Sequence, residues 1–325
     1  MDGFTMSAHI GIDLGGTNIK AGVVDDQCRI LATAWCKTAL PRPAERVVAD
    51  MARMAREAVA KSGRSMAEIC DVGVGSPGAA NPETGMVEYS CNLGFDFVPV
   101  SAMLSDRLGK PVFLENDANA AAYGEVLAGA AKGAGSCVCV TLGTGVGGGI
   151  VLDGRIYSGF NYAGAELGHM VIDMEGEPCA CGRRGCWESY ASATALIRQT
   201  HRAMEAHPDS AMWSIAGSPD DVDGRTAFDA MRRGDATGRA VVERYFDYLA
   251  CGLTNIINIF QPEVLCLGGG ICKEGDALLA PLEERIAKGR YNRFSKRQTR
   301  LCVATLGNDA GMIGAALLGR MRNAE

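Results

Sequence analysis

Two stretches of the chain repeat one strand–turn–strand pattern with a glycine-rich turn. The first, HIGIDLGGTNIKAGVVDD, starts at His9, and the second, CVCVTLGTGVGGGIVLDG, starts at Cys137. The two align without a gap, so that Leu14 matches Leu142. In each, a β-branched strand enters a Gly/Thr turn, resumes as an apolar strand and ends at an aspartate. Self-similarity at so wide a separation predicts a duplicated domain, because the repeats of a solenoid are much shorter.

The second turn contains GTGVGG, which matches the dinucleotide-binding pattern GxGxxG at Gly143, Gly145 and Gly148. That fingerprint requires a helix to begin at the glycines, whereas the segment that follows, GGIVLDGRIYSG, has the composition of a strand. We therefore predict a strand–turn–strand whose bare backbone amides face a phosphate group, and not a Rossmann site. Neither GxxxxGKS nor GxxxxGKT occurs, which excludes a P-loop.

Strands and helices alternate through the rest of the chain. A helix is predicted from Pro43, and a buried strand from Asp71 enters a Gly/Pro loop. The segment KPVFLENDANAAAYGE predicts a strand to Glu115 and then a helix capped by Asn116 or Asp117. Three helices, a strand that runs into glycines (PEVLCLGGGI) and a closing helix follow. This alternation predicts an α/β fold, with sheets covered by helices.

A further constraint is the segment ELGHMVIDMEGEPCACGRRGCWE, which begins at Glu166 and ends at Glu188. It has the pattern H-x9-C-x-C-x4-C, in which Gly182 and Gly185 would let the backbone fold tightly between the sulfurs. One nitrogen and three sulfur donors suit a closed tetrahedral zinc site with no position for a reacting water. We predict a structural zinc ion; the alternative is three buried thiols and a core histidine. The predicted ligands are His169, Cys179, Cys181 and Cys186.

Composition narrows the class of protein. A length of 325 residues suits about two domains. The net charge of -6 and the pI near 5.4 argue against nucleic acid as a partner, which requires a basic face. One basic segment, Lys288–Arg300, includes two aromatic residues and could bind RNA; we interpret it as a solvated surface segment.

The thirteen cysteines form no compact framework, and no apolar leader precedes them, which predicts a reducing cytoplasm. No apolar run approaches the roughly 20 residues that a membrane helix needs, so we expect no membrane partner.

Several motifs together resemble a known family. They are IDLGGTNIK, GSPGAAN, NLGF, ENDANAAAYGE, TLGTGVGGGI, GAELGHM with CACGRRGCWESYAS, PEVLCLGGGI and AGMIGAAL. The duplicated glycine hairpins resemble those of the actin-like sugar-kinase ATPases. The cysteine motif with its two bracketing glutamates resembles the ROK family (repressors, open reading frames, kinases), and within it the bacterial glucokinases. The resemblance covers nearly the whole chain.

The resemblance implies an actin-like ATPase (ribonuclease H-like) fold of two duplicated α/β domains with a cleft between them. The smaller domain would comprise residues 1–127 and 308–325. The larger would comprise residues 128–307 and carry the zinc loop. Sugar and ATP would meet in the cleft, and closure would exclude water.

The resemblance also implies roles for individual residues. Asp117 would be the general base that accepts the proton of the sugar hydroxyl; its alternative is a plain helix cap. Asp13 would help to hold Mg²⁺. The implied sugar contacts are Gly78, Asn92, Asn116, Asp117, Glu166, His169 and Glu188. The implied ATP contacts are Asp13, Gly15, Gly16, Thr17, Asn18, Gly143, Thr144, Gly145, Gly147, Gly268, Gly269 and Gly270.

The implied function is ATP- and magnesium-dependent phosphorylation of a hexose at O6, with glucose as the expected substrate. Kinases that act on N-acetylmannosamine, N-acetylglucosamine, mannose or allose are alternatives. A sugar-sensing repressor of the same family is a third hypothesis. Such repressors carry an N-terminal helix-turn-helix, and only about nine residues precede the first predicted strand, so we expect an enzyme. We further expect a homodimer or homotetramer.

Overall fold

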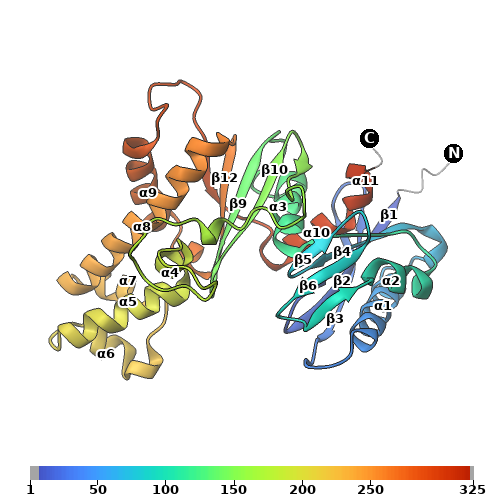
Figure 1. The fold of residues 1–325 in the computed structure, drawn as a ribbon, viewed down its shortest axis with the longest axis horizontal. Coiled ribbons are helices and arrows are strands. Elements are labelled where there is room, and N and C mark those ends of the chain that lie inside the picture. Colours follow the sequence, from blue (N-terminus) through green and yellow to red (C-terminus); the bar gives the residue numbers. More distant parts are fainter. Residues whose placement is uncertain (1–6, 323–325) are drawn as a thin grey trace. The chain divides into compact units, whose positions relative to one another are not determined.

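A computed structural model describes residues 7–322, which form two compact units. The first unit comprises residues 7–139, 149–165 and 304–322, and the second comprises residues 140–148 and 166–303 (Figure 1). The domain limits expected from the sequence, at residues 127/128 and 307/308, stay a prediction. Their outermost parts, residues 1–6 and 323–325, lie outside the described residues. Within residues 7–322, no helix is both long and apolar enough to cross a membrane.

The first unit is built on a five-stranded sheet with the strand order β3-β2-β1-β4-β8. Strand β2 runs antiparallel to both β1 and β3, whereas β1, β4 and β8 are parallel. The strands are β1 (Ala8–Leu14), β2 (Asn18–Asp25), β3 (Ile30–Lys37), β4 (Ile69–Ser76) and β8 (Val112–Asn116). Since β1, β4 and β8 are parallel, their carboxyl ends lie along one edge of the sheet, where ligands bind in open α/β folds.

The two faces of this sheet are covered in different ways. In β1, Ile10 and Ile12 belong to the apolar core that also contains Val47 and Met51 of helix α1. Gly11, between them, faces the other side of the sheet, as alternation along a strand requires. The helices that contribute to the first core are α1 (Ala44–Lys61) and α2 (Val100–Leu108). A small sheet of the same unit has the order β5-β6-β7, with β5 (Ala79–Asn81), β6 (Met86–Ser90) and β7 (Phe95–Val98).

On the second face of the sheet, helix α10 packs directly against a row of glycines. Gly11 pairs with Gly22 on one side and with Gly73 on the other. A Cβ on Gly11 would lie 1.9 Å from the carbonyl oxygen of Met312, and a Cβ on Gly73 would lie 1.7 Å from that of Ala315. Any larger residue would therefore push helix α10 off the sheet.

The remaining helices of the first unit follow from this contact. Helix α3 packs on α10 through Gly124 and Gly314, each of which would bring a Cβ within 2.2 Å of a carbonyl oxygen of the other helix. The helices are α3 (Asp117–Ala128), α10 (Ala310–Ala316) and α11 (Leu318–Arg322). This packing fixes α3, whose first turn follows β8 directly.

A second five-stranded sheet has the order β11-β10-β9-β12-β13. Its strands are β9 (Cys137–Leu142), β10 (Val146–Leu152), β11 (Arg155–Ile156), β12 (Val264–Gly269) and β13 (Arg300–Val303). The boundary between the two units falls inside β9 and β10. The second glycine turn joins β9 to β10, so that a strand and not a helix follows it, and the predicted strand–turn–strand is confirmed.

In the second unit, four helices (α4, α5, α7 and α9) pack against a long central helix, α8, and α6 packs against α7. The helices are α4 (Glu188–Ala191), α5 (Ala193–Ala206), α6 (Met212–Ala216), α7 (Thr226–Arg232), α8 (Ala236–Phe260) and α9 (Asp276–Gly289). Apolar residues of α8 recur at helical spacing and are buried, which is the pattern of a core helix. The helices predicted from the sequence in this half are all present, and the α/β fold class is confirmed.

Candidate functional site

Two acidic side chains lie at the carboxyl-end edge of the first sheet. Asp13 stands near the end of β1 and Asp117 follows β8. Burial raises the pKa of Asp13 to about 6; the negative charge of Asp117 adds to this rise and Lys20 opposes it. The start of α10 contributes to the burial, because a Cβ on Gly311 would lie 3.4 Å from the Asp13 carboxylate. Burial also raises the pKa of Asp117. A pair of perturbed carboxyl groups at this edge can hold a cation and accept a proton.

The first turn of α3 is capped by Asn116. Its side-chain oxygen accepts hydrogen bonds from the backbone amides of Ala118 (2.9 Å) and Asn119 (3.2 Å). Asp117 is the first residue of the helix, and its Oδ1 also accepts from the Ala118 amide at 2.9 Å. The alternative role of Asp117 as the cap is therefore wrong, because Asn116 takes that position.

Gly78 and Asn116, both predicted as sugar contacts, are joined directly. The Asn116 Nδ2 donates a hydrogen bond to the Gly78 carbonyl at 3.1 Å. Gly78 has a φ of +96°, and a Cβ there would lie 2.1 Å from the carbonyl oxygen of Tyr89, so only glycine fits. Asn92, the remaining predicted contact in this unit, is exposed and lies beside the first glycine turn, 3.8 Å from a Cβ placed on Gly16.

The first glycine turn, Gly15 to Asn18, is held by its own backbone and by Thr38. The Gly15 amide donates to the Asn18 carbonyl at 2.9 Å, and the Thr38 hydroxyl donates to the Gly15 carbonyl at 2.6 Å. The Thr38 amide donates to the carbonyl of Thr17 at 2.8 Å. Gly16, Thr17 and Asn18 themselves are exposed, so their amides can face a ligand.

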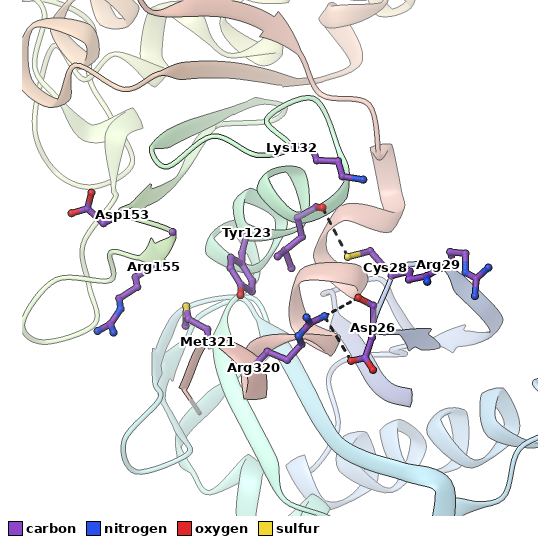
Figure 2. Close-up of a pocket in the computed structure, with 12 residues that line it drawn as sticks. Asp26, Cys28, Arg29, Tyr123, Lys132, Asp153, Arg155, Arg320 and Met321 are labelled. Atoms are coloured by element: carbon purple, nitrogen blue, oxygen red, sulfur yellow. Dashed lines mark hydrogen bonds and ion pairs between the residues drawn. The ribbon is translucent and has the colours of Figure 1, made fainter. Parts of the chain in front are cut away.

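A cavity of about 780 Å³ lies in another part of the first unit, between the turn at Asp26–Arg29 and the end of α11 (Figure 2). Arg320 inside it pairs with Asp26, with 3.7 Å between Nη1 and Oδ1. None of the predicted site residues lines this cavity. This cavity is therefore separate from Asp13 and Asp117.

The second glycine turn lies in the second unit and meets an acidic side chain. The Gly143 amide donates to the Gly145 carbonyl at 3.0 Å, and Gly143 and Thr144 are exposed. A Cβ on Gly145 would lie 2.6 Å from the Glu188 Oε2, and on Gly147 it would lie 2.6 Å from the hydroxyl of Thr141. The turn is therefore crowded on one side and open on the other.

The three glycines predicted to contact adenosine lie beside this second turn. Gly268 and Gly269 end β12, and Gly270 begins the 3-10 helix η4 (Gly270–Glu274). Gly269 has a φ of +107°, and a Cβ there would lie 2.1 Å from the carbonyl oxygen of Leu142, where β9 ends. At Gly270 a Cβ would meet nothing within 4 Å. Gly269 is thus required by packing, whereas Gly270 leaves open space.

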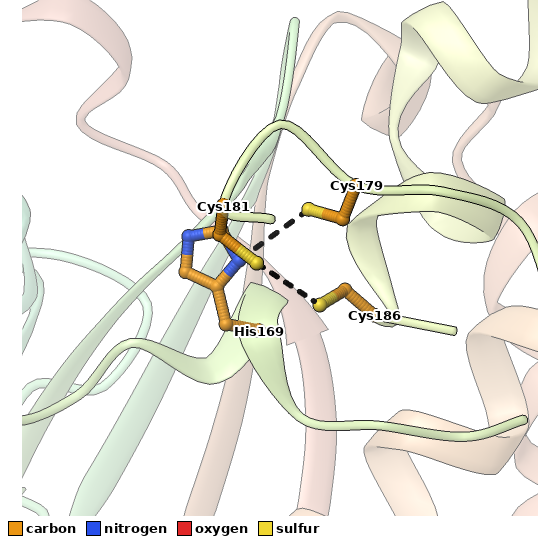
Figure 3. A group of neighbouring side chains, drawn as sticks. All are labelled: His169, Cys179, Cys181 and Cys186. Atoms are coloured by element: carbon orange, nitrogen blue, oxygen red, sulfur yellow. Dashed lines mark hydrogen bonds between the residues drawn. The ribbon is translucent and has the colours of Figure 1, made fainter. Parts of the chain in front are cut away.

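The histidine and the three cysteines of the H-x9-C-x-C-x4-C pattern converge (Figure 3). Their candidate ligand atoms all lie within 4.8 Å of one another. Cys179 Sγ is 3.7 Å from the Nδ1 of His169, and Cys181 Sγ is 3.5 Å from Cys186 Sγ. Burial, followed by the neighbouring thiols, raises the pKa of Cys186 to about 12. A bound cation would reverse this shift, because it stabilises thiolates.

Two glycines fold the loop that carries the thiols, as the sequence predicts. Gly182 and Gly185 have φ values of +87° and +75°. A Cβ on Gly185 would lie 1.5 Å from the carbonyl oxygen of Asp173, so that the two sides of the loop touch there. A β-bridge joins Val171 to Cys186. These contacts bring the histidine side of the loop to the cysteine side.

Glu188 is fixed by the core of the second unit. The preceding residue, Trp187, is fully buried, and its indole N–H donates to the Tyr248 carbonyl of α8 at 2.8 Å. A Cβ on Gly252 would lie 2.1 Å from the Trp187 ring, so α8 can approach only because that residue is glycine. The backbone at Glu188 is therefore held in place by the buried side chain of Trp187.

That carboxylate joins the thiol cluster to the second glycine turn. Its Oε1 lies 3.1 Å from Cys179 Sγ and 3.6 Å from the Nδ1 of His169. Its Oε2 lies 3.5 Å from the amide nitrogen of Val146. Glu166 differs: it stands before the 3-10 helix η2 (Leu167–His169), and its side chain is exposed and caps no helix.

Glu115 and Ser158 are not among the site residues predicted from the sequence. Glu115 is 3% exposed and is hydrogen-bonded to Ser158, 3.1 Å from its hydroxyl to either carboxylate oxygen. A signal was available for Glu115, because an acid ends the otherwise apolar strand KPVFLE. No local pattern marks Ser158.

A family model described as "ROK family" matches residues 9–322. A glucokinase from Thermotoga maritima is 40% identical over 315 residues, which cover 96% of this chain and 97% of that protein. Among solved structures, a ROK family glucokinase from Streptomyces griseus, in complex with glucose and AMPPNP, has a TM-score of 0.78 and 34% identity, and covers 97% of this chain and 99% of that one. A ROK hexokinase from Thermus thermophilus has a TM-score of 0.80 and 35% identity, with 95% and 97% covered. These similarities confirm the actin-like ATPase fold that the motifs implied.

Proposed function

The chain belongs to the ROK family, and on this basis we propose that it is an ATP-dependent hexose kinase that phosphorylates glucose at O6. Its similarity to glucokinases supports both the reaction and the sugar. The observation that carries the proposal most strongly is the pair of half-buried acids, Asp13 and Asp117, at the carboxyl ends of parallel strands, each with a raised pKa.

Asp117 would accept the proton of the sugar hydroxyl. As O6 of the hexose forms its bond to the γ-phosphorus of ATP, the bond from that phosphorus to the β,γ-bridging oxygen breaks, and the hydroxyl proton passes to a carboxylate oxygen of Asp117. The products are the sugar 6-phosphate and ADP, and the proton then leaves to solvent. The raised pKa of Asp117 supports this role, because a base of higher pKa accepts a proton more readily.

Asp13 would hold magnesium together with the phosphates of ATP. When bound, Mg²⁺ spreads the negative charge of the transferring phosphoryl group. The residues present suit this ion, because Asp13 offers a hard carboxylate oxygen beside a second carboxylate.

ATP would be bound largely by backbone. In the two glycine turns, amides that no side chain covers would face the phosphates. Open space at Gly270 supports contact with the adenosine there. The proposed ATP-binding residues are Asp13, Gly15, Gly16, Thr17, Asn18, Gly143, Thr144, Gly145, Gly147, Gly268, Gly269 and Gly270.

We also propose a structural zinc ion. A tetrahedral ion with Zn–S bonds of about 2.3 Å holds its sulfurs about 3.8 Å apart. The spacings of 3.5 Å for Cys181 to Cys186 and 3.7 Å for Cys179 to the Nδ1 of His169 are close to that value. His169 would bind through Nδ1, which leaves its Nε2 for the sugar. Glu188, next to both, would be aimed by the metal loop.

Several of the proposed sugar contacts carry carboxylate or amide groups. Glu166 offers an exposed carboxylate, and Asn116 keeps one amide hydrogen after it donates to Gly78. The proposed contacts are Gly78, Asn92, Asn116, Asp117, Glu166, His169 and Glu188. Carboxylates and amides suit a polyol, because each forms directional hydrogen bonds with hydroxyl groups.

Two further features belong to the same proposal. We place the enzyme in the cytoplasm, where ATP is available, and we expect a homodimer or homotetramer. Self-association is supported by an exposed apolar group in the second unit, where Tyr291 and Phe294 are each 90% exposed and Ile259 is 66% exposed. The Tyr291 amide donates to the Asn258 side chain at 2.8 Å, which holds this segment beside Ile259. Sedimentation of the wild type and of a Tyr291→Ser, Phe294→Ser variant would test it.

A coupled kinase assay over a panel of sugars tests the function. The panel is glucose, mannose, allose, fructose, N-acetylglucosamine and N-acetylmannosamine, each with ATP and Mg²⁺. Glucose should give the highest kcat/KM. If an N-acetylated sugar exceeds glucose by more than about tenfold, the sugar is wrong and the kinase survives; a 10-fold ratio corresponds to about 1.4 kcal/mol of transition-state binding. If no sugar is phosphorylated, the kinase proposal fails.

A further inference from the structure

A buried carboxylate stands immediately before the proposed sugar contact and the proposed base. Glu115, the fourth residue of β8, is 3% exposed. Its Oε1 accepts hydrogen bonds from the backbone amide of Asn116 at 2.9 Å and from the Nδ2 of Asn119 at 3.0 Å. The Ser158 hydroxyl lies 3.1 Å from both of its oxygens. Three donors from two separate segments thus converge on one carboxyl group.

This carboxyl group is costly to bury, so its retention calls for a reason. Burial raises the pKa of Glu115, and its hydrogen bonds to Asn119, Asn116 and Ser158 act in the opposite direction. An apolar side chain of similar size would avoid the desolvation penalty, and buried polar groups are in several cases kept for the geometry that they impose. Glu115 fits that case, because its partners are the residues that surround the start of α3.

The two segments that Glu115 joins both lead to proposed site residues. One is the first turn of α3, where Asn116 is the cap and Asp117 the first residue. The other begins at Ser158, whose carbonyl accepts from the Gly164 amide at 2.8 Å and so closes a loop just before Glu166. A single side chain therefore fixes the start of the helix that carries the base and the start of the loop that leads to a sugar contact.

We propose that Glu115 is a positioning residue: by holding the first turn of α3 against Ser158, it keeps Asp117 aimed at the hydroxyl that is phosphorylated. This inference rests on the proposed function, since it gives Asp117 a proton to accept. Glu115 itself touches neither sugar nor nucleotide in this scheme. Its contribution is geometric and needs hydrogen bonding rather than negative charge.

Three variants separate geometry from charge. Glu115→Gln keeps an oxygen that can accept from Asn116 and Asn119, and its amide can donate to the hydroxyl of Ser158. Glu115→Ala removes all of these contacts, and Ser158→Ala removes one. A control is Glu125→Gln. Glu125 is a buried carboxylate of α3 that accepts hydrogen bonds from the backbone amides of Ala130 and Leu306 at 2.7 and 2.9 Å, far along the helix from Asp117.

In Glu115→Ala, kcat should fall by about 10- to 100-fold, because a small misplacement of a catalytic group costs up to about that much. The KM for the sugar should rise by less than about fivefold, and Glu115→Gln should keep more than a third of the wild-type kcat. Ser158→Ala should have little further effect in the Glu115→Ala background, because the two residues act as one unit. Amide hydrogen exchange at Ala118 and Asn119 should be faster in Glu115→Ala but not in Glu115→Gln.

The proposal is overturned if Glu115→Ala keeps kcat within twofold of the wild type. It is also overturned if Glu115→Gln loses as much as Glu115→Ala. The proposal also fails if Glu115 acts only through stability. In that case the loss of kcat would be in the same proportion to the loss of thermal stability in Glu125→Gln as in Glu115→Ala. If the wild type phosphorylates no sugar, the proposed function fails; the exchange rates of Ala118 and Asn119 still decide whether Glu115 orders the turn.

Discussion

The two glycine turns share a backbone plan and differ in how each obtains an acidic group. In the first, the acid is Asp13, which belongs to the strand that enters the turn, is half-buried and interacts electrostatically with Asp117. In the second, the aligned residue is Thr141, which is exposed. Its acid comes instead from helix α4, where the Glu188 Oε2 lies 3.5 Å from the Val146 amide.

This difference indicates a division of labour between duplicated halves. The first half keeps perturbed carboxyl groups together, which suits chemistry on a phosphoryl group. The second half has one acid held between a glycine turn and a cluster of thiols, which suits binding and orientation. The two turns share a backbone plan, whereas the acidic groups beside them come from different elements.

The largest effect is expected when Asp117, the proposed base of the first half, is lost. Asp117→Asn should lower kcat by about 10²- to 10⁴-fold, because no group remains to accept the hydroxyl proton. Glu188→Gln, the matched change in the second half, should act mainly on the KM for the sugar. Steady-state kinetics with glucose measures both. Equal effects of the two variants on kcat would contradict the division of labour.

Asp13→Asn should separate activity from stability. The activity at fixed Mg²⁺ should fall by at least about 100-fold, since a metal contact to the phosphoryl group is lost. The metal-free protein should become more stable, because the pKa of Asp13 is raised from 3.8 to about 6 in the fold. In the wild type, the ionised form of Asp13 therefore opposes folding at pH values above 3.8. The unfolding free energy of Asp13→Asn should exceed that of the wild type by an amount that grows from pH 3.8 to about 6 and is then constant, on the order of 3 kcal/mol at most. Thermal melts at pH 5 and pH 7.5 test this, and a lower melting temperature at pH 7.5 would contradict it.

Disruption of the thiol cluster should affect sugar binding more than the fold of the first unit. Cys181→Ser should raise the KM for glucose by about 10- to 100-fold, the usual cost of disturbing the support of a metal site. Elemental analysis should find one zinc per wild-type chain and less in the variant. Cys70→Ser, at an exposed cysteine outside the cluster, is the control and should change neither quantity. A metal-free chain with full activity would end the zinc proposal.

The pH dependence of the kinase activity at limiting magnesium should reflect the ionisation of Asp13 in the first half. If Asp13 holds Mg²⁺ as proposed, it must be ionised to do so. Because burial raises the pKa of Asp13 to about 6, the apparent affinity for Mg²⁺ should rise with pH up to about 6 and then level off. Saturating Mg²⁺ should shift the pH-dependent rise in activity to lower pH, because the ion stabilises the ionised form of Asp13. Assays between pH 5 and 8 at two magnesium concentrations would show it. If the rise in activity occurs at the same pH at both magnesium concentrations, Asp13 does not hold the metal.

The smallest effect separates two glycines of one turn. Gly143→Ala places a Cβ where nothing lies within 4 Å, whereas in Gly145→Ala it lies 2.6 Å from the end of the Glu188 side chain. Glu188 can move, so Gly145→Ala should change thermal stability little and raise the KM for glucose by a few fold, about 1 kcal/mol or less. Thermal stability should be unchanged in Gly143→Ala. An equal rise in the glucose KM in both variants would show that the position of Glu188 does not depend on the space at Gly145.

Much of the fold could be predicted because its signals are local. The repeated hairpins predicted β1–β2 and β9–β10, and the spacing of apolar residues predicted α1 and α8. The grouping of His169 with three cysteines was also predictable, because the loop is short and its glycines mark the bends at Gly182 and Gly185.

The rest depends on contacts between distant segments. The row formed by Gly11, Gly22 and Gly73 is recognisable only when strand register and the position of α10 are known. The hydrogen bond of Glu115 to Ser158 joins residues that no local pattern connects. The assignment of the cap to Asn116 instead of Asp117 also required backbone angles, since both residue types favour that position.

The division of labour is tested most directly by the equilibrium binding of glucose to Asp117→Asn. Titration calorimetry would give the Kd of this variant and of the wild type without nucleotide. We expect Kd values within about threefold of each other, because asparagine can still hydrogen-bond the hydroxyl and the second half is unchanged. Loss of glucose binding in a folded Asp117→Asn variant would contradict it, because Asp117 would then serve to hold the sugar and its role as the base would lack support.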